Sequence, residues 1–356
     1  MLQEFLEKHK IGPQKIAVGV SGGADSLAAV LFCNQELKPL GYQIIALTVD
    51  HKLRPTSSKE AIFVADIMKI NNIEHHTLIW RGEKPKTGIE ETARSARYDL
   101  LAKWCFKNNV KYLITAHHLL DQAETFLMRL ERGSGLDGLC GMKEITPHQN
   151  LFILRPFLKT HPNIFKTYLT KKDITWVEDE SNHDNNLLRV KMRNFLPVLE
   201  KQTGITALQI ADTMERLQSS RSYFERKTQN ILENHFKNFE NTAFACKVEF
   251  FQNLENEIQY RLTSHLLKKI AGTSYPPEAQ KLLSLLSKIK QTNFKTATLN
   301  HCKILRRSNF LWFLPEQKTF SGNIDHLWKE YTLKHAEYKK TKLPAEIKRL
   351  LLASHR

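Results

Sequence analysis

Short apolar runs alternate with longer helical patterns through about residue 175, and no other feature of the sequence constrains the fold as strongly. Segments between the runs, such as DSLAAVLFCNQEL and ETARSARYDLLAKWCFKN, carry apolar residues at a spacing near 3.6. Alternating strands and helices predict an α/β fold with a doubly wound parallel sheet that binds ligands at the carboxyl ends of its strands. The expected strands are KIAVGV (15–20), YQIIALTV (42–49), HHTLIW (75–80), VKYLITA (110–116) and LFILR (151–155).

From about residue 205 the alternation stops, and long amphipathic patterns predict helices over 207–236, 259–272 and 277–290, before a strand-like stretch over 296–316. We therefore expect a first domain over 1–204 and a smaller, mainly helical domain over 205–318. A short basic tail over 319–356 is either a docked helix or a loose arm.

The charge of the chain favours a polyanionic partner such as nucleic acid, because 53 Lys and Arg face 37 Asp and Glu, a formal charge of +16. The alternative is a basic enzyme with no polyanionic ligand. No apolar run reaches the roughly 18 residues of a membrane span, and the N-terminus lacks a signal-peptide core, so we expect a soluble, cytoplasmic protein. The five cysteines are scattered without a Cys-x-x-Cys pair, which signals neither zinc nor a disulfide framework.

The six residues after the first expected strand, Ser21 to Ser26, read Ser-Gly-Gly-Ala-Asp-Ser. Gly22 and Gly23 permit positive φ and let backbone N–H groups approach a phosphate, and the helix that follows directs its N-terminus to the same place. The loop is neither a Walker A loop, since no Gly-Lys-Ser/Thr follows, nor a Gly-x-Gly-x-x-Gly fingerprint. It predicts an anion site, with a bare strand–helix turn as the alternative.

This hexapeptide resembles the Ser-Gly-Gly-x-Asp-Ser motif of the PP-loop ATP pyrophosphatases, a group with an adenine-nucleotide alpha hydrolase-like fold. Over roughly residues 12–315 the resemblance narrows to the tRNA(Ile)-lysidine synthetase family. Four further segments carry it in the same order, namely TVDHKLRPTS (48–57), IEETARSARYDLL (89–101), TAHHLLDQAETFLMRLERGSGLDGLCGM (115–142) and WVEDESNHDNNLLRVKMRNFLPVL (176–199), the last with an Asp-x-Ser-Asn pattern.

The resemblance implies an ATP-dependent ligase that joins L-lysine to C2 of the wobble cytidine of tRNA(Ile) with a CAU anticodon. The cytidine is first adenylated, AMP and diphosphate are released, and the tRNA then reads AUA instead of AUG. The implied cofactors are ATP and Mg²⁺, and the implied partners are the tRNA and lysine, with no DNA and no membrane. A homodimer stays open.

The implied site residues form three groups. The ATP-binding group comprises Ser21, Gly22, Gly23, Ala24, Asp25, Ser26, Asp50 and His51. Asp25, His117 and Asp121 are the catalytic candidates, and Asp25 and Asp121 are also the candidate magnesium ligands, since Mg²⁺ takes one or two carboxylates plus phosphate oxygens. The expected tRNA contacts are Arg94, Arg97, Arg129, Arg132, Arg189 and Arg193.

Several of these side chains have an alternative structural role. Glu90, Arg94 and Arg97 form one stripe of a helix, which suits either surface ion pairs or phosphate contact. A helix over about 119–132 places Ala123, Phe126, Leu127 and Leu130 on one face and Asp121, Glu124 and Arg132 on the opposite one, which is either a solvated face or a phosphate site. The glycines of ERGSGLDGLCGM suggest either a mobile loop near the site or an ordinary connection.

The sequence departs from the family pattern at three positions. Leu120 stands where the resemblance implies an aspartate, Lys52 where it implies glycine, and Val190 where it implies asparagine. The alternatives are a tRNA 2-thiolation enzyme on the same fold, whose chemistry usually relies on a cysteine pair, and a non-catalytic RNA-binding protein.

Overall fold

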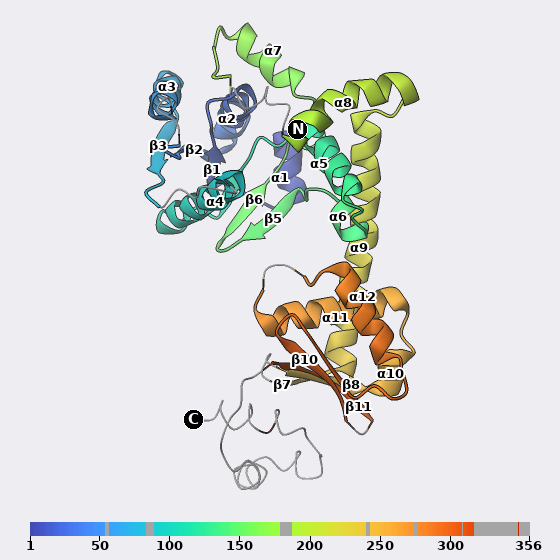
Figure 1. Cartoon of the computed structure of the whole chain (residues 1–356). Helices are drawn as coiled ribbons and strands as arrows, with labels where there is room; N and C mark the ends of the chain where they lie inside the picture. Colours follow the sequence, from blue (N-terminus) through green and yellow to red (C-terminus); the bar gives the residue numbers. More distant parts are fainter. Residues whose placement is uncertain are drawn as a thin grey trace. The chain divides into compact units, whose positions relative to one another are not determined.

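The computed structural model describes residues 1–53, 57–82, 89–178, 187–239, 243–273, 276–307, 309–316 and 348, and of residues 89–91 only the backbone. The chain divides into two compact units, Met1–Arg221 and Ser222–Arg356 (Figure 1). This division lies inside a long helix, α9 (Ala207–His235), which begins just after the boundary expected near 204, so the first unit extends further along the chain than expected. The basic tail over 319–356 lies, except for residue 348, outside the described residues.

The first unit contains a six-stranded sheet with the order β3-β2-β1-β4-β6-β5. The paired strands run parallel except that β5 is antiparallel to β6. The strands are β1 (Lys15–Gly19), β2 (Gln43–Asp50), β3 (Glu74–Ile79), β4 (Tyr112–Ile114), β5 (Ile145–His148) and β6 (Leu151–Leu154). All five expected strands are confirmed, whereas β5 was missed because it is a short edge strand that contains Pro147.

Helices cover both faces of this sheet, which confirms the doubly wound α/β fold. Successive β2 residues alternate between two cores, with Ala46 packed among residues of α2 and Leu47 among residues of α4. The helices of this unit, besides the start of α9 and the 3-10 turn Lys38–Leu40, are α1 (Leu2–Lys8), α2 (Ala24–Leu37), α3 (Ser57–Ile70), α4 (Ile89–Lys107), α5 (Leu119–Glu131), α6 (Leu136–Leu139), α7 (Asn163–Lys171) and α8 (Leu188–Thr203).

The second unit is built from helices and an antiparallel sheet with the order β7-β8-β11-β10-β9. Its strands are β7 (Lys237–Phe239), β8 (Ala243–Lys247), β9 (Thr296–Leu299), β10 (Cys302–Arg307) and β11 (Phe310–Pro315). Its further helices are α10 (Val248–Gln252), α11 (Asn256–Ala271) and α12 (Ala279–Ile289). The sequence predicted a mainly helical domain, but this unit also contains a sheet. Strands β7 and β8 were not predicted because they are short and lead into α10 without a clear alternation of apolar and polar residues.

Apolar residues from the helices and the sheet of this unit form one core, to which α11 contributes Leu262 and Leu266 and β10 contributes Ile304. In the described part of the chain, no helix has the length and apolar character needed to cross a membrane.

Candidate active site

The loop Ser21–Ser26 joins the carboxyl end of β1 to the N-terminus of α2. Gly22 has φ +90°, and an added Cβ would lie 3.3 Å from the Cγ2 atom of Val64, so a side chain here would be strained and crowded. Gly23 is the N-cap of α2, where the first helical N–H groups lack helical partners. The loop and helix terminus therefore have the local geometry of an anion site.

Two serines and a neighbouring segment hold the loop in this conformation. The Oγ atom of Ser26 accepts the Ser21 N–H at 3.0 Å, donates to the Gly23 carbonyl at 3.0 Å and lies 3.1 Å from the Ser21 hydroxyl. The backbone N–H of Val177 donates to the Gly22 carbonyl at 3.0 Å. Ser21 and Ser26 thus order the loop.

Asp50 and His51 follow at the carboxyl end of β2, the neighbour of β1 in the sheet. The Asp50 carboxylate is buried and accepts hydrogen bonds from the Lys52 N–H at 3.0 Å and from the hydroxyls of Ser57 and Ser58 at 2.8 and 3.0 Å. Burial alone would raise the pKa of Asp50, but these hydrogen bonds outweigh it and lower the pKa to about 2. The geometry gives Asp50 the role of ordering this turn, and its contact with ATP stays a prediction.

Lys52 has φ +52°, in the left-handed region that glycine adopts without strain. This explains why the family resemblance implies glycine at that position. Lys52 offsets the strain through its contacts, because its backbone N–H bonds to Asp50 and its ammonium forms an ion pair with the same carboxylate at 3.1 Å.

His118 connects the glycine loop to α5. It is the N-cap of α5. Its ring Nδ1 atom accepts a hydrogen bond from the Asp121 backbone N–H at 3.3 Å, and its backbone N–H donates to the Asp121 carboxylate at 2.9 Å. On the other side of the ring, Nε2 lies 3.5 Å from the Asp25 carboxylate. The predicted residues Asp25 and Asp121 are therefore brought to opposite edges of one buried imidazole.

The two neighbouring histidines have opposite electrostatic environments. Burial alone would lower the pKa of His118, but the carboxylates of Asp25 and Asp121 raise it above its ordinary value. Burial lowers the pKa of His117 to about 3; the charge of Asp121 opposes this shift, and the charges of nearby arginines add to it. The His117 ring is therefore neutral near pH 7, and its Nδ1 atom lies 2.8 Å from the Thr115 hydroxyl.

A network of ion pairs joins α5 to α8. Arg189 donates to Asp121 at 2.6 Å and to Glu124 at 2.7 Å, and Arg193 donates to Glu124 at 2.7 Å. Burial would raise the pKa of Asp121, but the charges of His118 and Arg189 lower it. Arg189 and Arg193, expected to contact tRNA, are thus turned towards carboxylates, and their contact with tRNA stays a prediction.

Glu124 is the residue that sequence reasoning missed. It was placed on a polar face with Asp121, yet its side chain is fully buried. The signal was present in the spacing, because Asp121 and Glu124 are one turn apart, as are Arg189 and Arg193. Two complementary pairs at helical spacing indicate facing helices. The opposite face behaves as expected at Ala123, which is buried, whereas Leu130 is 52% exposed.

The departure at Leu120 also has a packing explanation. Leu120 packs against an apolar cluster that contains Ala123 and Leu196. Its side chain therefore contributes to the α5–α8 contact and leaves Asp121 in place. Val190, a second departure, is buried in α8.

The other predicted arginines lie in two places. The guanidinium groups of Arg94 and Arg97 lie 5.4 and 5.5 Å from the centre of the Tyr98 ring, and the charge of Arg94 lowers the pKa of His117. Arg129 and Arg132 are exposed, Arg129 in the last turn of α5 and Arg132 at its C-cap, so Arg132 is about 16 Å from Asp121 along the axis. The side chain of Glu90 and the Asp-x-Ser-Asn segment lie outside the described residues.

The residues present fit a magnesium ion through Asp25 better than through Asp121. The Asp25 side chain is 39% exposed beside the glycine loop. Both carboxylate oxygens of Asp121 accept hydrogen bonds, one from the His118 N–H and one from Arg189. One protein carboxylate with phosphate oxygens is a donor set that Mg²⁺ accepts, and Asp121 joins it only if Arg189 moves away.

The loop between α5 and β5 is tied to two helices. The side-chain amide of Gln122 donates to the Met142 carbonyl and accepts the Met142 N–H, both at 2.9 Å. Gln218 of α9 donates to the carbonyls of Cys140 and Met142. The C-terminal part of this loop is thus held by the helices around the site, which favours an ordinary connection over a mobile loop, the two alternatives that its glycines left open.

Comparison with known proteins identifies the family. Residues 1–199 match the family model of the PP-loop domain. A tRNA(Ile)-lysidine synthase of Wolbachia pipientis is 37% identical over 85% of this chain and 71% of that protein. One of Ruegeria pomeroyi is 31% identical over 86% of this chain and 72% of that protein. A tRNA thiolase structure from Methanococcus maripaludis, 18% identical, superimposes with a TM-score of 0.51 over 61% of this chain and 78% of that one, which shows a shared fold. The chain belongs to the tRNA(Ile)-lysidine synthase family of PP-loop proteins.

Proposed function

We propose that this protein uses ATP to join L-lysine to C2 of the wobble cytidine of tRNA(Ile) with a CAU anticodon, which forms lysidine and releases AMP and diphosphate. The tRNA then reads AUA instead of AUG and carries isoleucine instead of methionine. The observation that carries the proposal is the convergence of the glycine loop, Asp25 and Asp121 on His118 in a chain that aligns with lysidine synthases over most of its length.

The glycine loop supports the adenylation step. With its N–H groups, the Ser21–Ser26 loop would hold the β and γ phosphates of ATP at the N-terminus of α2. The O2 atom of cytidine attacks the α phosphorus, and the bond to diphosphate breaks. The ε-amine of lysine then attacks C2, and the C2–O2 bond breaks with release of AMP. Adenylation thus converts a poor leaving oxygen into a good one.

Asp25 is the residue that would hold magnesium together with the phosphates, and a bound Mg²⁺ would neutralise charge that develops on diphosphate. Within the protein, His118 keeps the Asp25 and Asp121 carboxylates apart and oriented, because it contacts both.

His117 supports proton removal from the lysine ammonium, which must be neutral to attack. Its neutral ring accepts a proton, although a pKa of about 3 makes it a weak base in this state. The charges of Arg94 and Arg155 contribute to that low value. A triphosphate bound beside these arginines would offset their charge and raise the pKa of His117.

The two alternatives have weaker support. All five cysteines are buried, and burial raises the pKa of Cys105 to about 12, so the thiolates that sulfur transfer requires are disfavoured. A non-catalytic RNA-binding role was suggested by Leu120, but Leu120 is accommodated by packing beside an intact Asp121.

The test is incubation of the protein with labelled lysine, ATP and an unmodified tRNA(Ile) transcript with a CAU anticodon. We expect label in the RNA, one AMP per lysine, and a mass increase at the wobble cytidine. The Asp25→Asn variant should bind the tRNA but fail to incorporate lysine. Sulfur transfer, or tRNA binding by folded protein without incorporation, would contradict the proposal. A homodimer stays a prediction.

A further inference from the structure

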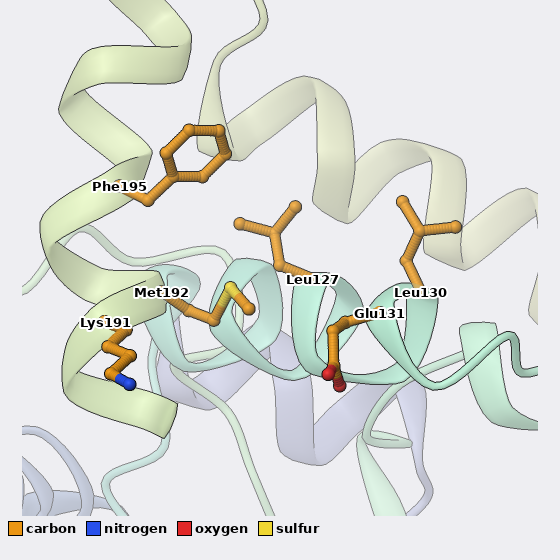
Figure 2. Close-up of a pocket in the computed structure, with 6 residues that line it drawn as sticks. All are labelled: Leu127, Leu130, Glu131, Lys191, Met192 and Phe195. Carbon is orange, nitrogen blue, oxygen red and sulfur yellow. The ribbon is translucent and has the colours of Figure 1, made fainter. Parts of the chain in front are cut away.

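An apolar pocket of about 500 Å³ lies between α5 and α8 (Figure 2). It is lined by Leu127, Leu130, Glu131, Lys191, Met192 and Phe195. Figure 2 shows Phe195 and Met192 of α8 extending towards Leu127 of α5. Phe195 is 45% exposed and Leu130 52% exposed. Exposed apolar side chains gathered around a hollow of this size are typical of a binding site.

The pocket lies beside the catalytic cluster because the same two helices build both. Met192 is adjacent in sequence to Arg193, which bonds to Glu124, and Leu127 is about one turn beyond Glu124. The rise from Asp121 to Leu127 along α5 is about 9 Å. An RNA chain whose reacting nucleotide lay at Asp121 would therefore bring a neighbouring nucleotide to the pocket.

Resting on the proposed function, we propose that this pocket binds an unstacked base that flanks the target cytidine in the anticodon loop. Bases of single-stranded loops are splayed out and stack on aromatic side chains. The ring of Phe195, with the thioether of Met192 and the side chain of Leu127, supplies such an apolar surface.

Charges around the pocket match RNA. Lys191 is exposed at the rim and is placed to bind a phosphate, while the exposed Glu131 carboxylate is an acceptor for the exocyclic amine of adenine, guanine or cytosine. Beyond the pocket, α5 ends in the exposed cations Arg129 and Arg132, which form no ion pair with any described residue. The net charge of +16 favours a polyanionic partner such as RNA.

The test uses Phe195→Ala in the full chain, with Phe106→Ala as the matched control, since Phe106 is 65% exposed on a different helix, α4. Loss of one stacked base should weaken binding of the tRNA(Ile) transcript by about 5- to 150-fold, whereas the control should bind like wild type. Phe195→Tyr keeps an aromatic ring and should restore binding. Circular dichroism shows whether each variant is folded.

Abasic transcripts locate the base. Removing the base on one side of the cytidine should weaken tRNA binding by the wild-type protein as much as Phe195→Ala does. The same abasic transcript should bind the Phe195→Ala variant no more weakly than the intact transcript does. Additive losses at both flanking positions, or wild-type affinity in Phe195→Ala, would overturn the inference. So would a raised KM for lysine, or a changed oligomeric mass, with tRNA binding unaltered.

The two proposals fail separately. If wild-type protein incorporates lysine while Phe195→Ala binds tRNA normally, the base pocket is wrong and the proposed function stands. If binding depends on Phe195 but no lysine is incorporated, the RNA site stands and the proposed reaction is wrong.

Discussion

The ion pairs between α5 and α8 predict an asymmetric effect on stability. Glu124 is fully buried, whereas its partners Arg189 and Arg193 are 40% and 37% exposed. Replacing both arginines with methionine leaves a buried carboxylate without its partners, which should cost about 3–5 kcal/mol of unfolding free energy. Glu124→Gln leaves two guanidinium groups that water reaches, so the cost should be about 1–2 kcal/mol.

The decisive comparison is the triple variant that combines all three changes. Glu124→Gln should destabilise the wild-type protein but stabilise the double-methionine variant, because there it removes an unpaired buried charge. Urea unfolding at pH 7, followed by circular dichroism, measures each free energy, and a loss of 3 kcal/mol corresponds to a midpoint shift of about 1–3 M. If Glu124→Gln destabilises both backgrounds equally, Glu124 is not a buried partner of the two arginines and the reasoning is refuted.

Three other predictions concern the strand ends. The pKa of Asp50 is about 2 in the folded protein, below the value near 3.9 of an unfolded chain. About 2 kcal/mol of stability should therefore be present above pH 4 and lost as the pH falls towards 2. Asp50→Asn should remove this part of the acid sensitivity in urea unfolding, and an unchanged pH profile would contradict the prediction. His117 should show no titration between pH 5 and 8 in NMR spectra, because its pKa is about 3, and a midpoint near 6.5 would contradict the site geometry. Because Gly22 has φ +90°, Gly22→Ala should lose about 1–2 kcal/mol of stability and also lose ATP binding. The control Gly12→Ala, whose added Cβ has nothing within 4 Å, should keep both its stability and its ATP binding. Equal effects of the two changes would show that the loop conformation does not matter.

The sequence predicted the first unit well because the local pattern of apolar residues in each strand matches the position of that strand in the sheet. A parallel strand buried on both faces is a short, continuous apolar run, and β1 and β2 have this form. The glycine loop was equally readable, since the positive φ of Gly22 is a local requirement. Short strands such as β5 and β7 were missed because their pairing partners, more than their own residues, determine them.

The roles of charged side chains were decided by tertiary structure. On sequence alone, Arg189 and Arg193 resemble free cations, and Glu124 resembles a solvated acid. Only the crossing of α5 and α8 brings them together and buries the carboxylate. Likewise, two adjacent histidines are equivalent in sequence, yet His117 is partly buried near arginine charges and His118 is buried between two carboxylates, which separates their pKa values.

The chain itself thus determined the alternation of strands and helices, the position of the anion loop and the family. Only the fold decided which charges are paired, which histidine is neutral and where an apolar pocket opens between two helices. The physical reason is that backbone preferences act over a few residues, whereas desolvation and charge pairing depend on segments that are distant in sequence and close in space.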